Sequence, residues 1–138
     1  MVSRTTAALP RIAALPAWLA GAGFGLPGVY AIWYFAQHHS VWTFLGYPTY
    51  GGGPFEDAGI ATTMPLLVMF LLVCLAEVVA GWMLWRNHPA APIVSLALLP
   101  VEFAFWIGFA LPAGPVLGLT RTALVLPALF RSHPRSRR

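Results

Sequence analysis

The chain has 138 residues, of which 59% are hydrophobic and only 9% are charged, and its mean hydropathy is +0.74. This apolar excess excludes an ordinary soluble domain of the same length. The net charge is +4 at pH 7, but seven of the eight arginines lie in the terminal segments or in one short turn. That pattern is typical of a membrane protein with a basic cytoplasmic face and argues against a nucleic-acid groove. With Cys74 as the only cysteine, an intramolecular disulfide and a cysteine metal cluster are also excluded.

The first apolar segment long enough to cross a membrane is 17–37. Its start resembles a signal peptide, but apolar sequence continues to residue 36, which favours a retained helix. Residues 1–15 are expected to form a short basic and apolar lead-in before this helix. Gly21 and Gly25 form a small-xxx-small pair, which predicts the close approach of a neighbouring helix. Pro27 is expected to bend the helix.

The segment 38–59 is polar but rich in aromatic residues, and its Gly and Pro residues predict a compact loop on the membrane surface. Its aromatic side chains are expected to anchor the loop at the level of the lipid headgroups. They are Trp42, Phe44, Tyr47, Tyr50 and Phe55. Segment 60–85 follows, with more than about twenty almost uncharged residues, enough to cross a hydrocarbon core of roughly 30 Å. Glu56 and Asp57 are expected to begin this second helix, because acids favour the positive end of a helix.

Two further spans are predicted at 91–111 and 114–130, followed by a basic tail at 131–138 that is expected to be disordered. The sequence therefore predicts one integral membrane domain over 1–138, an all-α protein with a four-helix transmembrane bundle. Arginines lie in both terminal segments and in the second-to-third turn, which predicts cytoplasmic N and C termini. The lipid bilayer is the expected partner, and no nucleic acid is expected.

Three ionisable residues fall inside the predicted spans: Glu77, Glu102 and Arg121. At about 1.5 Å per residue they lie roughly 14, 20 and 15 Å from the ends of their helices that face the arginine-rich side, and hence near the midplane. Groups at one level on three antiparallel helices can meet, so Arg121 is expected to pair with one carboxylate. The other is then protonated or shares the guanidinium, because two acids and one base are not all stable as charges in a low dielectric.

The residues around these charges predict that they face the inside of the bundle. Thr120 and Thr122 flank Arg121 as expected hydrogen-bond partners, and Trp106 belongs to an aromatic wall beside Glu102. A polar cluster beside an aromatic wall is suited to a flat, lipid-like molecule with a polar head. The same cluster is also suited to fixing helix register alone, and both interpretations stay open at this stage.

Other constellations predict less. His38 and His39 are expected at the outer end of the first helix, with Glu56 and Asp57 across the loop, but adjacent histidines point in different directions and no ligand spacing is present, so no metal is predicted. There is no phosphate loop, nucleophile motif or haem-attachment sequence. The catalytic residues are unknown, and whether the chain is an enzyme stays open.

Three stretches in the second half, LAEVVAGWMLWRNHPAAPIVSLALL, FAFWIGFALP and RTALVLPAL, resemble the DoxX-like group of small four-helix bacterial membrane proteins. In that group an acid followed by a small-residue turn ends the second helix, next to a short basic loop. The resemblance implies a multi-pass protein of a bacterial plasma membrane. It also implies a quinone as the candidate cofactor, or membership of a redox complex. The first half, with its YPTYGGGPFE loop, does not take part in the resemblance.

Together these observations predict a small accessory or binding subunit. Its Glu77/Glu102/Arg121 cluster would orient a quinone or lipid, or dock a partner subunit. The alternative is an oligomeric proton-coupled transporter of small molecules, in which Glu77 or Glu102 cycles a proton. A third hypothesis is a membrane enzyme that acts on lipid with the two acids as general acid and base. The sequence does not identify the substrate, the oligomeric state or the partner.

Overall fold

The computed structural model describes residues 4–131, and four long helices make up most of them. They are α1 (Arg4–His38), α3 (Met64–Trp85), α4 (Ala91–Gly108) and α5 (Ala113–Arg131). In this part of the chain, all four are long and apolar enough to cross a membrane. The predicted fold class, an all-α four-helix transmembrane bundle, is confirmed. Residues 132–138 of the predicted basic tail lie outside the described residues.

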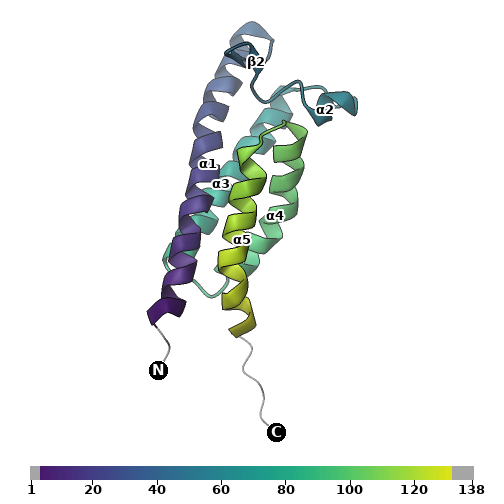
Figure 1. The fold of residues 1–138 in the computed structure, drawn as a ribbon. Helices are drawn as coiled ribbons and strands as arrows, with labels where there is room; N and C mark the ends of the chain where they lie inside the picture. Colours follow the sequence, from purple (N-terminus) through teal and green to yellow (C-terminus); the bar gives the residue numbers. More distant parts are fainter. Residues whose placement is uncertain (1–3, 132–138) are drawn as a thin grey trace.

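The four helices form a ring, so that each one contacts two neighbours. Helix α1 contacts α3 and α5, and α4 contacts the same two helices from the other side. Helix α1 begins and α5 ends at the same end of the bundle (Figure 1). We call this the terminal end and the opposite one the loop end. With 22 residues, α3 spans about 33 Å, which matches the hydrocarbon core of a bilayer.

The first helix is longer than the sequence predicts. It begins at Arg4, so the expectation of a lead-in over residues 1–15 is wrong from Arg4 onward. The helix runs unbroken through Pro10, Pro16 and Pro27, although each proline lacks a backbone donor. Ala13 and Ala14 explain the extension, because both are completely buried against the neighbouring helices. Tertiary packing of small side chains outweighs the helix-breaking tendency of the flanking prolines.

The small residues of α1 allow the close contact with α3 that was predicted. A Cβ on Gly21 would lie 2.7 Å from the carbonyl oxygen of Cys74 and 2.8 Å from Cγ2 of Val78. A Cβ on Gly25 would lie 3.3 Å from the Cβ of Cys74. Closer to the terminal end, the ring of Trp18 packs against Gly81 of α3, and its indole N–H donates to the carbonyl of Val78 at 3.2 Å. Backbone and side chains of the two helices therefore approach as closely as glycine permits.

The loop between α1 and α3 contains a small hairpin and a short helix. Strands β1 (Thr43–Phe44) and β2 (Tyr47–Pro48) pair antiparallel. They are joined by Leu45 and Gly46, both with positive φ, as in a primed two-residue turn. Helix α2 (Pro54–Asp57) follows the hairpin.

The start of the second membrane span differs from the prediction. Glu56 and Asp57 belong to α2, and residues 58–63 separate them from α3, so they do not begin the second helix. Gly59 adopts a φ of +82°, which ends α2, and Pro65 occupies the first turn of α3, where a missing N–H costs nothing.

Two of the predicted surface aromatics pack against the core instead: Tyr50 is buried and Phe55 is half-buried. Tyr50 is only 2% exposed and donates its hydroxyl to the carbonyl of Phe24 at 2.7 Å, and burial raises the pKa of this phenol. The ring of Phe55 packs edge-on against Phe105 and Phe109. Five such rings close the loop end, and we call them the aromatic plug: Tyr50, Phe55, Phe70, Phe105 and Phe109.

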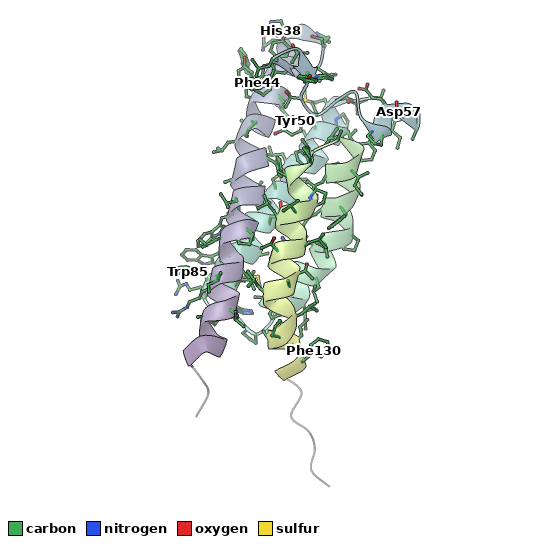
Figure 2. All side chains as sticks on the ribbon, viewed as in Figure 1. His38, Phe44, Tyr50, Asp57, Trp85 and Phe130 are labelled. Atoms are coloured by element: carbon green, nitrogen blue, oxygen red, sulfur yellow. The ribbon has the colours of Figure 1, made fainter. Side chains whose placement is uncertain are left out.

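The remaining loop aromatics are more exposed. Phe44 and Tyr47 are 59% and 77% exposed at the hairpin, while Trp42 is half-buried beside Tyr30. Figure 2 places Phe44 at the loop end and Trp85 toward the terminal end. Small and aliphatic side chains close the terminal end, and we call them the aliphatic layer: Ala13, Ala14, Leu84, Ala91 and Val125. The buried core thus consists of interlocked rings at the loop end and of small and aliphatic side chains at the terminal end, where the half-buried Trp18 packs against them.

Candidate functional site

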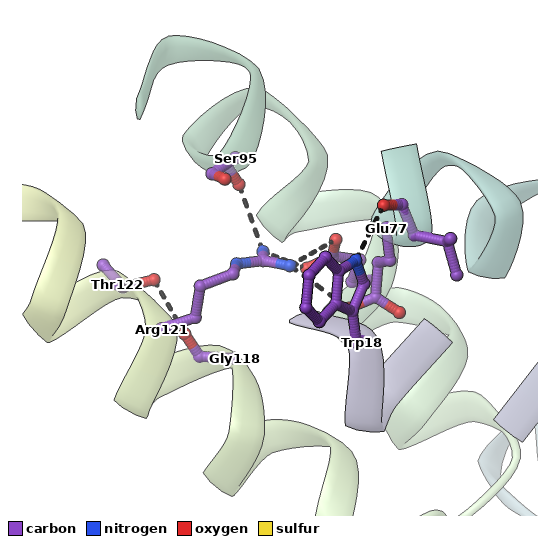
Figure 3. A network of polar contacts seen from close by, with 8 residues as sticks. Trp18, Glu77, Ser95, Gly118, Arg121 and Thr122 are labelled. Carbon is purple, nitrogen blue, oxygen red and sulfur yellow. Dashed lines mark hydrogen bonds and ion pairs between the residues drawn. The ribbon is translucent and has the colours of Figure 1, made fainter. Parts of the chain in front are cut away.

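The three intramembrane charges meet in the centre of the bundle. Arg121 extends from α5 across the ring toward α3 and α4 (Figure 3). Its Nη1 donates to Oε1 of Glu77 at 3.1 Å and to Oε1 of Glu102 at 3.0 Å. Its Nη2 donates to Oε2 of Glu102, so Glu102 is held by both nitrogens. The three side chains are 1%, 0% and 1% exposed for Glu77, Glu102 and Arg121. We call them the charge cluster.

The backbone of α4 supplies the fourth acceptor, and a backbone carbonyl has no signal in the sequence. Nη2 of Arg121 donates to the carbonyl oxygen of Ser95 at 3.1 Å. Three buried polar atoms make no hydrogen bond to any group in the described part of the chain: Oε2 of Glu77, Oγ of Ser95 and Nε of Arg121. Buried polar atoms are ordinarily satisfied by protein or by ordered water. The cluster therefore has hydrogen-bonding capacity left over.

The two threonines beside Arg121 have a different role from the one expected. The hydroxyl of Thr120 donates to the carbonyl of Val116, and that of Thr122 donates to the carbonyl of Gly118, both at 2.8 Å. Each bond returns to the preceding turn of the same helix, a pattern that threonine commonly adopts inside helices. The prediction that these hydroxyls bind Arg121 is not met by this geometry.

Trp106 lies beside the cluster and packs against the glycine face of α5. It is 1% exposed, and its ring occupies the space where Gly114 and Gly118 would carry a Cβ. The two glycines, which are four residues apart on α5, thus admit an aromatic ring from α4 rather than a helix backbone. The aromatic wall beside Glu102 is present, but Trp106 is itself packed against protein.

The charge balance of the cluster sets what it can do chemically. Two carboxyl groups share one guanidinium, and their nearest oxygens lie within about 6 Å of each other because both contact the same nitrogen. In a buried site a fully ionised set would leave one negative charge uncompensated, which costs several kcal/mol. The cluster can therefore exchange a proton, or it can fix three helices in register.

An apolar groove lies on the lateral surface between α1 and α3. Its volume is about 210 Å³, and its lining is almost entirely aliphatic: Gly21, Ala22, Gly25, Leu26, Val29, Leu71, Cys74, Leu75 and Val78. Cys74 and Val78 belong to the turn of α3 that carries Glu77 between them. One turn of α3 therefore has the groove on one side and the charge cluster on the other.

A second cavity opens at the terminal end. It has a volume of about 200 Å³ and lies where α1, the turn between α3 and α4, and α5 converge. Its lining contains Pro10, Asn87, His88, Pro89, Ala91, Pro92 and Ala128. We call it the end pocket. Ala91 belongs both to this pocket and to the aliphatic layer.

The residues considered for a metal site are held by other contacts. Nδ1 of His38 lies 3.1 Å from the carbonyl of Tyr34, and the two rings stack. Glu56 accepts a hydrogen bond from Thr62 at 3.0 Å. In the described part of the chain, no three His, Cys, Asp or Glu residues form a group suited to a metal ion.

Comparison with known proteins adds no family. No family model matches the chain, and no match is found among curated proteins or solved structures. The resemblance of the second half to DoxX-like proteins therefore stays a prediction.

Proposed function

We propose that this chain is a small accessory protein of the membrane that binds one apolar chain in the groove between α1 and α3. The occupant is the acyl chain of a lipid or the isoprenoid tail of a quinone. The observation that carries the proposal is the position of the groove, with the turn Cys74–Val78 as its wall and Glu77 on the other face of that turn.

The size and chemistry of the groove select this class of occupant. Sites for drug-sized molecules usually measure about 300–1,000 Å³, so a groove of about 210 Å³ suits a single chain rather than a ring system. Its lining offers no aromatic ring for stacking, and it opens sideways on helices that span the membrane. Lipid tails are the molecules present at that depth.

The charge cluster supports this function by holding the groove wall. Arg121 ties α3 to α4 and α5, so the turn that carries Cys74 cannot rotate without breaking the bond to Glu77. A buried ionic group that fixes register is an established use of such pairs. On this proposal the charge cluster fixes the register of the helices and, by doing so, holds the wall of the binding groove in place.

The test compares two substitutions of exposed, membrane-level alanines. Ala22→Phe fills the groove, whereas Ala104→Phe adds the same ring to a lipid-facing site on α4. Purified protein in mild detergent is titrated with a pyrene-labelled acyl chain. We expect saturable binding that Ala22→Phe weakens by about tenfold, or about 1.4 kcal/mol, and that Ala104→Phe leaves unchanged. Equal binding by both variants, or no saturable binding, rejects the proposal. Loss of binding together with cross-linked dimers would instead favour a second copy or a partner helix.

A second candidate function is proton-coupled transport by an oligomer. The observation that favours it is the sharing of one guanidinium by two carboxyl groups, with Oε2 of Glu77 unpartnered in the described structure. This function requires that Glu77→Gln or Glu102→Gln abolish pH-driven flux in proteoliposomes while the protein stays folded. Unchanged flux in both variants would exclude it.

The orientation in the membrane is part of the proposal. Arg11 and Arg86 lie at the terminal end, where α1 begins and α5 ends. By the positive-inside rule this end faces the cytoplasm. A bacterial plasma membrane is the location that the DoxX-like resemblance implies.

A further inference from the structure

We propose that water and protons reach the charge cluster from the terminal end only, through the end pocket. The pocket is lined by the exposed His88 and the buried Ala91, and Ser95 lies one helical turn further along α4. The proposal does not depend on what the groove binds.

The first argument compares the length of helix between the charges and the end pocket with the length between the charges and the outermost ring of the aromatic plug. On α5, Ala128 of the pocket lies seven residues from Arg121, or about 10 Å along the helix. On α4, Phe109 of the aromatic plug lies seven residues from Glu102, again about 10 Å. Seven residues thus separate the cluster from the end pocket on α5 and from the outermost ring of the aromatic plug on α4.

The second argument is what fills those two lengths. Toward the loop end stand the interlocked rings of the aromatic plug, with Trp106 next to them. Toward the terminal end stands the aliphatic layer, in which three of the five members are alanines and Leu84 is the largest, with the half-buried Trp18, Met83 and Leu124 packed against it. The end pocket already penetrates to Ala91, which is a member of that layer. On this proposal, a movement of Leu84, the largest side chain of the layer, would join the pocket to the region of Ser95.

The third argument is a polar group at the point where such a path would arrive. The hydroxyl of Ser95 is buried, its side chain being 1% exposed, and makes no hydrogen bond within the described chain. The carbonyl of the same residue accepts from Nη2 of Arg121 at 3.1 Å. A water bonded to this hydroxyl would lie near the guanidinium, because the carbonyl of the same residue contacts Nη2, and the charge cluster contains two further unpartnered polar atoms.

The experiment measures access to single cysteines in a Cys74→Ala background. The reporter is Ser95→Cys, with Ala91→Cys one turn nearer the pocket as a second reporter. The matched control is Ala31→Cys, which is about equally buried but belongs to the same core cluster as the rings of the aromatic plug. Protein in oriented proteoliposomes is treated with a charged, membrane-impermeant methanethiosulfonate, which reacts with a hydrated thiolate. Retained folding is checked by size-exclusion chromatography.

We expect Ser95→Cys to react at least about tenfold faster than Ala31→Cys, and only when the reagent is applied at the terminal end. Adding Ala128→Phe, which fills the pocket, should slow the reaction by about tenfold. Adding Ala123→Phe, on the exposed side of α5, should leave it unchanged. Reaction from the loop end, a rate equal to that of Ala31→Cys for both reporters, or no effect of Ala128→Phe would overturn the proposal. A failed lipid-binding test would leave this result unaffected, so the two proposals fail separately.

Discussion

Replacing Arg121 by leucine tests whether the charge cluster holds the bundle together. The guanidinium makes two bonds to Glu102, one to Glu77 and one to the carbonyl of Ser95, all in the buried interior. Removing one partner from a buried ion pair costs about 3–5 kcal/mol, because the remaining charge is left uncompensated. Typical folds are stable by only about 5–15 kcal/mol. Arg121→Leu should therefore remove about a fifth or more of the free energy of unfolding.

The hydrogen-bond pattern also predicts how the lost stability divides between the interactions of Arg121 with Glu102 and with Glu77. Because Glu102 receives two bonds and Glu77 one, Arg121 should couple about twice as strongly to Glu102 as to Glu77 in double-mutant cycles. Adding Glu102→Gln to Arg121→Leu should restore part of the stability, because it removes one uncompensated carboxylate.

The chain contains its own reporter for this assay. Cys74 is the only cysteine and is buried, so a thiol-reactive dye labels it when the helices separate. Labelling is followed in bicelles during denaturant titration. The matched control is Arg86→Leu, which removes an exposed arginine whose guanidinium lies 5.0 Å from the ring centre of Trp82 and should cost no more than about 1 kcal/mol. A loss for Arg121→Leu no larger than that of Arg86→Leu, or no recovery in the double variant, would refute the reasoning.

Three other predictions follow from contacts outside the cluster. Gly118→Val should destabilise the bundle by about 1–3 kcal/mol, because its Cβ would meet the Trp106 ring. Gly23→Ala, which has open space around it, should leave the stability unchanged. Thermal unfolding of both variants measures the difference. Tyr50→Phe should cost about 1 kcal/mol at pH 7, measured by the same Cys74 labelling, because the bond to the Phe24 carbonyl is lost. The pKa of Tyr50 is raised in the folded state, so the wild type should keep its full free energy of unfolding below about pH 10 and lose about 1.4 kcal/mol per pH unit above it. Tyr50→Phe should lose less over the same pH range. Equal slopes for the two proteins would contradict the burial argument.

The spans and the meeting of the charges were accessible from the sequence because both follow from the bilayer. Apolar length predicts a crossing helix, and a charge inside such a helix must find a partner, which placed Glu77, Glu102 and Arg121 together. Which face of each helix is buried was harder to predict from the sequence. Lipid and protein interior are both apolar, so neither periodicity nor hydropathy distinguishes buried Leu84 from exposed Leu75.

Other features depend on tertiary contacts that local patterns do not encode. Tyr50 and Phe55 are residue types typical of interface anchors. They pack against the core because Gly108 leaves room for the Phe55 ring and because both rings contact Phe109. The extension of α1 through its prolines depends on the fit of Ala13 and Ala14. The carbonyl of Ser95 is an acceptor for Arg121 because of where α4 lies, and a backbone acceptor has no sequence signal.

The central claim, that the groove between α1 and α3 holds one lipid-like chain, is tested most directly by identifying what the protein carries. Wild type, Ala22→Phe and Ala104→Phe are purified in mild detergent with native lipids, and bound small molecules are extracted and identified by mass spectrometry. The account predicts a chain-bearing lipid or quinone that is retained in a fixed ratio by wild type and Ala104→Phe and is lost from Ala22→Phe. Equal retention by all three proteins, or no retained molecule in wild type, would contradict it.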